Sequence, residues 1–145
     1  MKILELGHVV LYVSNLKRSA DFYKDTLGFT EISRDTHTAL FSSGRTHHEM
    51  LLIEIGGAPR EIGFPQVGLY HIGFKIGNSP KDIQTAYKEL TEKGVSFVGA
   101  SDHTITHSLY ILDPDNNELE LYADVSDAWI ENPKAILSPV KRLPL

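Results

Sequence analysis

Cysteine is absent from this chain of 145 residues. Its absence excludes disulfides, thiolate metal ligands and a cysteine nucleophile, and it fits the reducing cytoplasm, where we expect the protein to work. Long apolar runs are missing too. No stretch approaches the roughly 20 residues of a membrane helix, and the first residues lack the apolar core of a signal peptide. We therefore expect a soluble protein without a membrane partner.

Basic charge is also scarce. Lys and Arg number 14 against 19 Asp and Glu, which gives a formal net charge of -5. Such a chain offers no basic surface for nucleic acid or anionic lipid, so we expect a small-molecule partner instead. The hydrophobic content of 41% and the length are those of one globular domain, residues 1–145, that can bury a sizeable core.

The same order of elements occurs twice, because β-branched and aromatic runs alternate with capped amphipathic stretches. The first module, residues 1–57, predicts strands at 3–13, 29–33, 38–42 and 48–55 and a helix from Ser14 or Asn15 to Gly28. The second, residues 67–123, predicts strands at 67–76, 95–100, 105–112 and 118–122 and a helix from Asn78 or Ser79 to Gly94. Residues 56–66 link the modules. The tail, residues 124–145, is expected to pack over the body with Trp129 as its anchor.

The two βαβββ modules predict an α+β fold. In each module a histidine, His8 or His71, lies on the first strand and a glutamate, Glu54 or Glu120, on the last. Residues 113–117 read Asp-Pro-Asp-Asn-Asn and predict a hairpin turn before Glu120. Strand alternation places Glu118, Glu120 and Tyr122 on the face opposite Leu119 and Leu121.

A histidine and a glutamate recurring in both modules predict a metal site. Imidazole and carboxylate together suit divalent iron, manganese, zinc, nickel or cobalt. Two histidines and one carboxylate on one face leave positions open for a substrate and for dioxygen. The predicted ligands are His8, His71 and Glu120.

The paired modules, Leu-Gly-Phe at residues 27–29 and Asp-Pro-Asp-Asn-Asn-Glu-Leu-Glu-Leu at residues 113–121 resemble the vicinal oxygen chelate superfamily. This superfamily contains extradiol dioxygenases, glyoxalase I, methylmalonyl-CoA epimerase and fosfomycin- and bleomycin-resistance proteins. The resemblance implies a curved eight-stranded mixed sheet around a metal-binding cleft, and a homodimer. Asn116 stands where the family usually has glycine, and asparagine tolerates the positive φ that this turn position requires.

Within the superfamily the motifs resemble small catechol 2,3-dioxygenase-like members. The pair His47-His48, Tyr110 ten positions before Glu120, and His103 are the features that carry this likeness. The resemblance implies an Fe(II)-dependent extradiol dioxygenase. In it His48 would act as an acid–base group and Tyr110 would hydrogen-bond a substrate hydroxyl. His103 is our candidate for a second acid–base residue, and His107 is the alternative candidate for the same role.

Two other classes stay open. In a glyoxalase I-like isomerase or lyase, Glu54 would be a fourth ligand beside His8, His71 and Glu120, and the metal would stabilise an enediolate without oxygen. A resistance protein that only sequesters a small molecule is the third class. The intact ligand set argues against it, because such binders can dispense with these residues.

Overall fold

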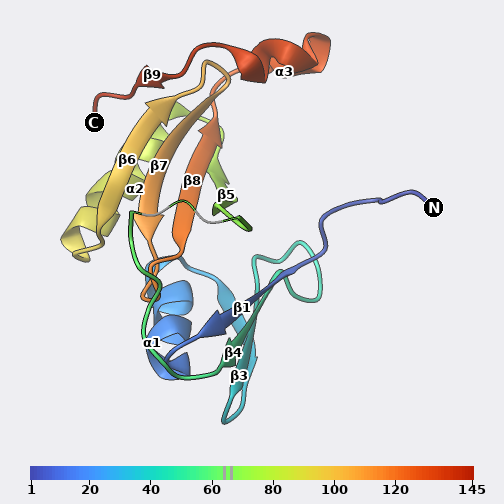
Figure 1. Ribbon diagram of the computed structural model, residues 1–145. Helices are drawn as coiled ribbons and strands as arrows, with labels where there is room; N and C mark the ends of the chain where they lie inside the picture. The colour runs from blue at the N-terminus through green and yellow to red at the C-terminus, as the bar shows by residue number, and fades with distance from the viewer. Residues whose placement is uncertain (64, 66) are drawn as a thin grey trace. The chain divides into compact units, whose positions relative to one another are not determined.

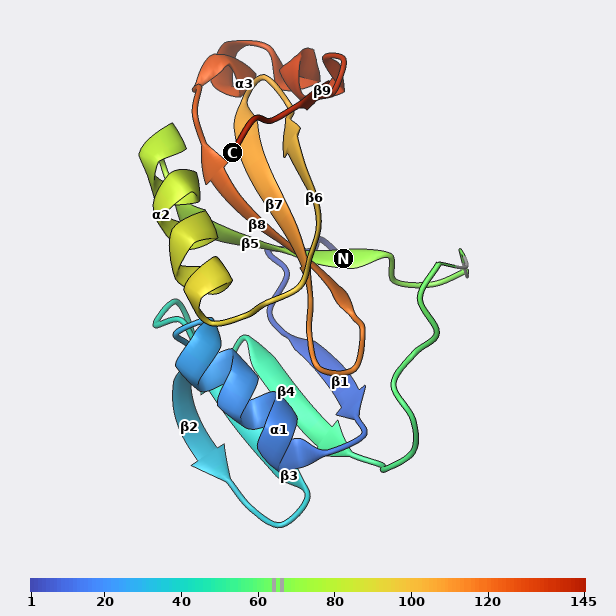
Figure 2. The ribbon, with the colours of Figure 1, turned by 90° about the vertical axis from the view of Figure 1, so that its left-hand side faces the viewer.

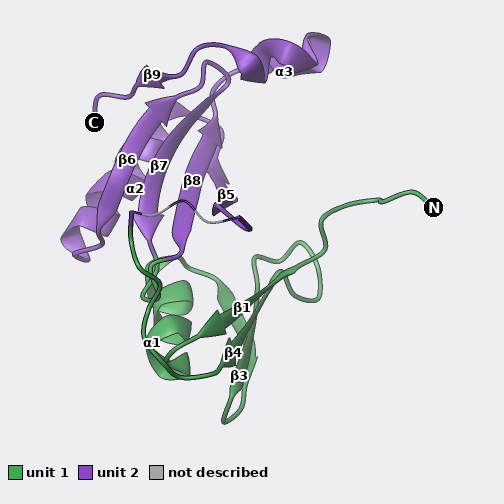
Figure 3. Cartoon of the chain, viewed as in Figure 1, with its two compact units in different colours: residues 1–62, 113–116 green, residues 63–112, 117–145 purple. Residues whose placement is uncertain are grey.

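The structure is a computed structural model that describes residues 1–145 except 64 and 66. It contains two compact units, coloured separately in Figure 3. Unit 1 comprises residues 1–62 with 113–116, and unit 2 comprises residues 63–112 with 117–145. Part of the predicted linker, at positions 64 and 66, lies outside the described residues.

Unit 1 is a four-stranded sheet with a helical segment on one face, in the strand order β1-β4-β3-β2 (Figure 1; β2 is labelled in Figure 2). Its elements are β1 (Val9–Val13), α1 (Leu16–Asp21), η1 (Phe22–Thr26), β2 (Thr30–Arg34), β3 (Thr38–Ser42) and β4 (Met50–Glu54). β1 pairs with β4 in parallel, and the other two pairs are antiparallel. This is the predicted βαβββ order.

The capping residues and the apolar side chains of the segment explain why unit 1 forms its helix here. Asn15 is the N-cap, since its side chain accepts a hydrogen bond of 2.8 Å from the backbone N–H of Arg18. Ala20 and Tyr23 are fully buried against the sheet. Gly28 ends the segment with a φ of 79°, a conformation that glycine adopts without strain.

Residues 113–116 form a turn that belongs to unit 1 through its hydrogen bonds. The buried Asp115 carboxylate accepts from the Ser14 backbone N–H at 3.1 Å, the Ser14 hydroxyl, the Ser19 hydroxyl at 3.1 Å and the Arg18 guanidinium at 2.9 Å. Asn116 has a φ of 63°, so it holds the left-handed position predicted for it. The turn is fixed by polar contacts rather than by apolar packing.

Unit 2 is a five-stranded sheet in the order β5-β8-β7-β6-β9, with one long helix on one face (Figure 2). Its elements are β5 (His71–Gly77), α2 (Pro80–Glu92), β6 (Phe97–Asp102), β7 (Thr106–Leu112), β8 (Glu118–Asp124), α3 (Ala128–Glu131), η2 (Pro133–Leu137) and β9 (Lys141–Arg142). β5 pairs with β8 in parallel, and β7 pairs antiparallel with both β8 and β6.

The core of unit 2 lies between α2 and the sheet. Ile83 and Leu90 of α2 are buried, as are the residues of β7 and β8 that face it, among them Leu109, Ile111 and Leu119. Each fully buried side chain of this size stabilises the fold by about 1.5–3 kcal/mol. Because one face of the sheet is used for this core, the residues between these positions point to the opposite face.

Three expectations need correction. The α+β class holds, but the predicted strands lie in two sheets of four strands each, the second extended by β9. A single curved eight-stranded sheet is not confirmed. The strand predicted at residues 3–13 begins at Val9, since its partner β4 begins at Met50 and earlier residues have no strand to pair with. The strand predicted at residues 67–76 begins at His71.

The tail is held differently from the prediction. Trp129 is 46% exposed and α3 has no buried residue, so the tryptophan is not the anchor. β9 instead pairs with β6, with Lys141 opposite Asp102 and Arg142 opposite Ser101. No helix among the described residues is long and apolar enough to cross a bilayer.

Candidate metal and active site

The open face of the unit 2 sheet gathers most of the predicted site residues. In the ladder of β5 and β8, His71 lies opposite Glu118 and Gly73 opposite Glu120. In the ladder of β8 and β7, Glu120 lies opposite Tyr110. Since Leu119 and Leu121 of β8 face α2, these polar groups share the other face, as alternation predicted.

A continuous series of short contacts joins four of these side chains. His71 Nε2 lies 3.1 Å from Glu120 Oε2. The Tyr110 hydroxyl donates to Glu120 Oε1 at 3.3 Å, and His103 Nε2 lies 2.8 Å from that hydroxyl. A phenol has one proton to donate, so His103 donates when the Tyr110 proton points to Glu120. The residues His71, Glu120, Tyr110 and His103 thus form one polar network in unit 2.

Tyr110 remains a protonated phenol in this network. Burial, followed by the negative charge of Glu120 and the hydrogen bond to it, raises the pKa of Tyr110 to about 12. At neutral pH the hydroxyl is therefore a donor. Its aromatic ring lies 5.8 Å from the His71 ring, measured between centroids.

The structure separates the two competing histidines. His103 follows β6 in a tight turn in which Thr104 has a φ of 73°, and its ring reaches Tyr110. His107 lies in β7 opposite Asp102, and its Nε2 is 3.7 Å from that carboxylate. Successive residues of a strand alternate in direction, so His107 points to the opposite face from Tyr110. Of the two, His103 belongs to the network.

The donor atoms of His71 and Glu120 suit a metal ion. The 3.1 Å separation of His71 Nε2 and Glu120 Oε2 would let both atoms bind one divalent ion at the usual metal–ligand distances of about 2.0–2.2 Å. His71 Nδ1 is buried and makes no hydrogen bond. Gly73, opposite Glu120, carries no side chain, so no β5 side chain covers the carboxylate at this position. One nitrogen and one oxygen donor therefore converge from neighbouring strands.

The remaining predicted residues lie in unit 1. His8 immediately precedes β1, and its ring lies 4.6 Å from the His48 ring. His47 Nδ1 and His48 Nδ1 are 2.5 Å apart, which requires one proton between them. Desolvation, followed by the charges of His47 and His8, lowers the pKa of His48. His48 therefore favours its neutral form, which can accept a proton.

Glu54 does not occupy the place that the repeat suggested. Matching His8 with His71 and following the two parallel ladders makes Leu51, not Glu54, the counterpart of Glu120. The Glu54 carboxylate accepts a hydrogen bond of 2.6 Å from the backbone N–H of Leu16, the first residue of α1. It thus satisfies a free N–H at a helix N-terminus on the α1 side of the sheet.

Glu118 was missed as a candidate. Its carboxylate Oε1 lies 3.6 Å from His71 Nδ1, and it hydrogen-bonds the hydroxyl of Tyr70. Strand alternation had already placed Glu118 on the face of Glu120, so the signal was present in the sequence. Apart from positions 64 and 66, which are not described, no group of three or more His, Asp or Glu is arranged to hold a metal. His8 is in unit 1, so the three-residue ligand set remains a prediction.

Comparison with known proteins assigns the family. The model of the Glyoxalase/Bleomycin resistance protein/Dioxygenase superfamily matches residues 5–121. The chain belongs to this superfamily. Relatives within it include a catechol-2,3-dioxygenase of Bacillus subtilis, 31% identical over 123 residues, which are 82% of this chain and 41% of the relative. A biphenyl-2,3-diol 1,2-dioxygenase of Rhodococcus globerulus is 31% identical over 82% of this chain and 63% of its own length.

The chain thus spans about two fifths and three fifths of these two superfamily dioxygenases. The metallothiol transferase FosB of Staphylococcus haemolyticus is 32% identical over 120 residues, which are 81% of this chain and 81% of that protein. Among solved structures, a glyoxalase/dioxygenase from Nostoc punctiforme has a TM-score of 0.69 at 19% identity, covering 85% of this chain and 92% of that one. This structural likeness shows the shared fold.

Proposed function

We propose that the protein is a metal-dependent enzyme that opens a catechol-like ring beside its two hydroxyls, using dioxygen. The observation that carries the proposal is the contact series from His71 through Glu120 and Tyr110 to His103. It supports the proposal because a nitrogen and oxygen donor pair, a neutral phenol donor and an imidazole lie on one face. The similarity to dioxygenases of catechol and biphenyl-2,3-diol supports the same chemistry.

His8, His71 and Glu120 would hold the metal, for which Fe(II) is our choice, with Mn, Ni, Zn or Co as alternatives. Two imidazoles and one carboxylate would leave positions open on such an ion for the two catechol oxygens and for dioxygen. A relative named as a manganese-dependent 2,3-dihydroxybiphenyl 1,2-dioxygenase, from Geobacillus genomosp. 3, supports a divalent ion of this class.

The other site residues handle protons and orientation. Tyr110 is a donor at neutral pH, so it would bind a catechol oxygen and fix the ring. A catechol loses protons when it chelates a metal. When Tyr110 instead donates its proton to His103 Nε2, the phenol oxygen would accept a catechol proton and pass its own to His103. His48, whose pKa is lowered, is a second imidazole able to take up a proton. We expect the enzyme to be a homodimer in a reducing cytoplasm.

The experiment is dioxygen uptake by protein loaded with Fe(II) without air, then given catechol or 2,3-dihydroxybiphenyl. We expect uptake of about one dioxygen per ring opened, followed by the absorbance of the cleavage product. His103→Asn should lower kcat by about 100-fold, as expected when an acid–base group is removed. His107→Asn is the matched control, because it removes a histidine from the opposite face, and it should retain activity.

A second candidate is transfer of a thiol to a small electrophile. It is favoured by the metallothiol transferase relative, whose length this chain covers more fully than that of the first two dioxygenases. The same network would serve it, since Tyr110 could donate to an oxygen of the acceptor. Metal-loaded protein given cysteine as the thiol and fosfomycin as the acceptor tests this candidate. Thiol consumption with no dioxygen uptake on any catechol would replace the dioxygenase proposal.

A further inference from the structure

One nitrogen of His71 lacks a partner in a place where it needs one. His71 Nδ1 is buried and makes no hydrogen bond, whereas Nε2 faces Glu120 at 3.1 Å. The nearby carboxylate of Glu118 has its Oε1 3.6 Å from Nδ1, just beyond hydrogen-bond range. Buried polar groups in proteins are nearly always hydrogen-bonded, so this exception calls for an explanation.

The strand ladder brings Glu118 to this position. His71 and Glu118 are direct partners in the parallel pairing of β5 and β8. Glu118 lies two residues before Glu120, so both carboxylates point to the same face, one toward each ring nitrogen of His71. The Glu118 side chain is 21% exposed, which leaves it room to turn.

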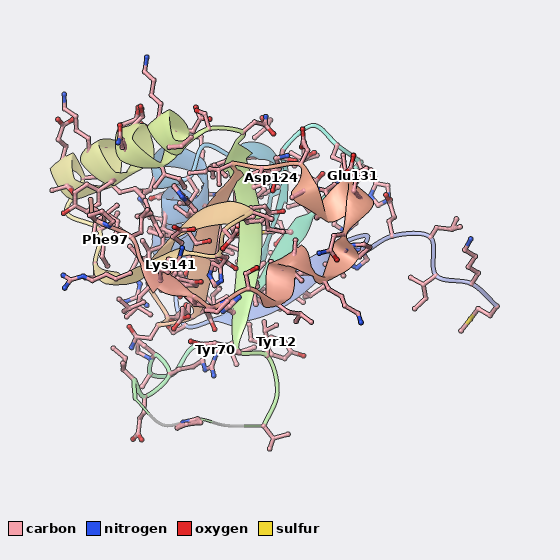
Figure 4. The ribbon with its side chains drawn as sticks, turned by 90° about the horizontal axis from the view of Figure 1, so that it is seen from above. Tyr12, Tyr70, Phe97, Asp124, Glu131 and Lys141 are labelled. Atoms are coloured by element: carbon pink, nitrogen blue, oxygen red, sulfur yellow. The ribbon has the colours of Figure 1, made fainter. Side chains whose placement is uncertain are left out.

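Tyr70 is a second neighbour of the Glu118 carboxylate. It lies at the N-terminal end of β5, as labelled in Figure 4, and hydrogen-bonds Glu118. Its ring lies 4.7 Å from the His71 ring. Glu118 can therefore accept from Tyr70 and His71 together.

The proton on His71 must move when Nε2 becomes a ligand. A neutral imidazole carries one proton, and without a metal the contact between Nε2 and Glu120 places it on Nε2. A metal at Nε2 requires the free electron pair of that nitrogen, so the proton must reside on Nδ1. A buried Nδ1–H needs an acceptor, and Glu118 is the carboxylate beside it.

We propose that Glu118 is a positioning residue that accepts a hydrogen bond from His71 Nδ1 and thereby fixes the tautomer and orientation in which His71 binds the metal. The inference rests on the proposed metal centre but not on the reaction it performs. Tyr70 also hydrogen-bonds Glu118, so Glu118 would link Tyr70 to the metal ligand His71. Removing such an outer partner lowers metal affinity by about 10–100-fold in other metalloproteins.

The test uses Zn(II) alone as the probe, because it is diamagnetic and binds imidazole and carboxylate. Zinc affinity is measured by competition with a chelator for the wild type, Glu118→Gln and Glu118→Ala. We expect a loss of about 10–100-fold for alanine and a smaller loss for glutamine, which keeps an accepting oxygen. Both variants lose the negative charge of Glu118, so the difference between their zinc affinities reports the hydrogen bond to His71 Nδ1.

Two further measurements exclude a merely structural effect. Nitrogen-15 NMR of the zinc-bound wild type should show a proton on His71 Nδ1 that exchanges slowly, and this protection should be lost in Glu118→Ala. In a His71→Ala background, Glu118→Ala should lower the affinity little further, because the partner is gone. Glu92→Gln, an exposed glutamate of α2, is the control of equal charge and should bind zinc as the wild type does.

The outcomes separate the two proposals. Wild-type protein that binds no zinc would overturn the metal centre itself, and the inference with it. Tight zinc binding that is unchanged in Glu118→Ala would overturn the role of Glu118 and leave the metal centre standing. If no preparation, the wild type included, has dioxygenase activity but the zinc affinities decrease from the wild type through Glu118→Gln to Glu118→Ala, only the proposed reaction would be overturned.

Discussion

Replacing Asp115 by alanine should destabilise unit 1 more than any other single change in its turn. The Asp115 carboxylate is buried and accepts hydrogen bonds from the Ser14 backbone N–H, the hydroxyls of Ser14 and Ser19, and the Arg18 guanidinium. Alanine offers none of these acceptors. The loss in the free energy of unfolding then depends on how well each donor that has lost its acceptor can bond to water instead.

The magnitude follows from the burial of each donor. Ser19 is fully buried, so its hydroxyl cannot reach water, and an unsatisfied group of this kind costs about 1–3 kcal/mol. The Ser14 backbone N–H adds about 1 kcal/mol by the same reasoning. The Arg18 side chain is 48% exposed and returns to solvent. The sum is about 2–4 kcal/mol, which lowers Tm by roughly 10 °C for a domain of this size.

Urea unfolding and differential scanning calorimetry measure the loss. Asp115→Asn keeps one acceptor oxygen and should fall between the wild type and Asp115→Ala. Asp21→Asn is the control, since Asp21 pairs with Lys17 and Arg34 near the surface, and its Tm should stay unchanged. If Asp115→Ala and Asp21→Asn melt at the same temperature, the buried-acceptor argument is wrong.

Three further changes have defined outcomes. Burial and Asp113 raise the pKa of Tyr23, so stability should be lost as pH rises above about 10, where unfolded tyrosine ionises. In urea unfolding, the free energy of unfolding of Tyr23→Phe should therefore fall less steeply with pH in this alkaline range than that of the wild type. An equally steep fall would contradict the role given to Tyr23. Asn116→Gly should leave Tm nearly unchanged, whereas Asn116→Ala should lower stability by about 1–2 kcal/mol at this left-handed position. Tyr110→Phe should reduce kcat about 10-fold or more with the metal still bound, and loss of metal instead would refute its orienting role.

The element order was predictable because its signals are local. Asn15 caps α1, Pro80 opens α2, and Gly28 ends the helical segment at a positive φ, so residue type and spacing sufficed. Alternation along β8 likewise placed Glu118 and Glu120 on one face. Such patterns depend on strand and helix periodicity, which the chain carries in its own sequence.

Strand register was not predictable, because it depends on which residues pair. Matching Glu54 with Glu120 by sequence ignored the ladder, in which Leu51 is the true counterpart. The first strand was predicted too long for the same reason, since the described residues before Val9 pair with no strand. The choice between His103 and His107 depends on the turn after β6, which brings His103 to Tyr110 and which residue spacing alone does not define.

Metal affinity measured on matched ligand variants tests the central claim most directly. Fe(II) or Zn(II) is titrated into the wild type, His8→Ala, His71→Ala, Glu120→Ala and Glu54→Gln, with folding checked by circular dichroism. We predict that His8→Ala, His71→Ala and Glu120→Ala each lose affinity by at least about 100-fold, while Glu54→Gln, which alters only the α1 N-terminus, binds as the wild type does. Unchanged binding by His8→Ala or Glu120→Ala, or loss of binding by a folded Glu54→Gln, would contradict the proposed ligand set.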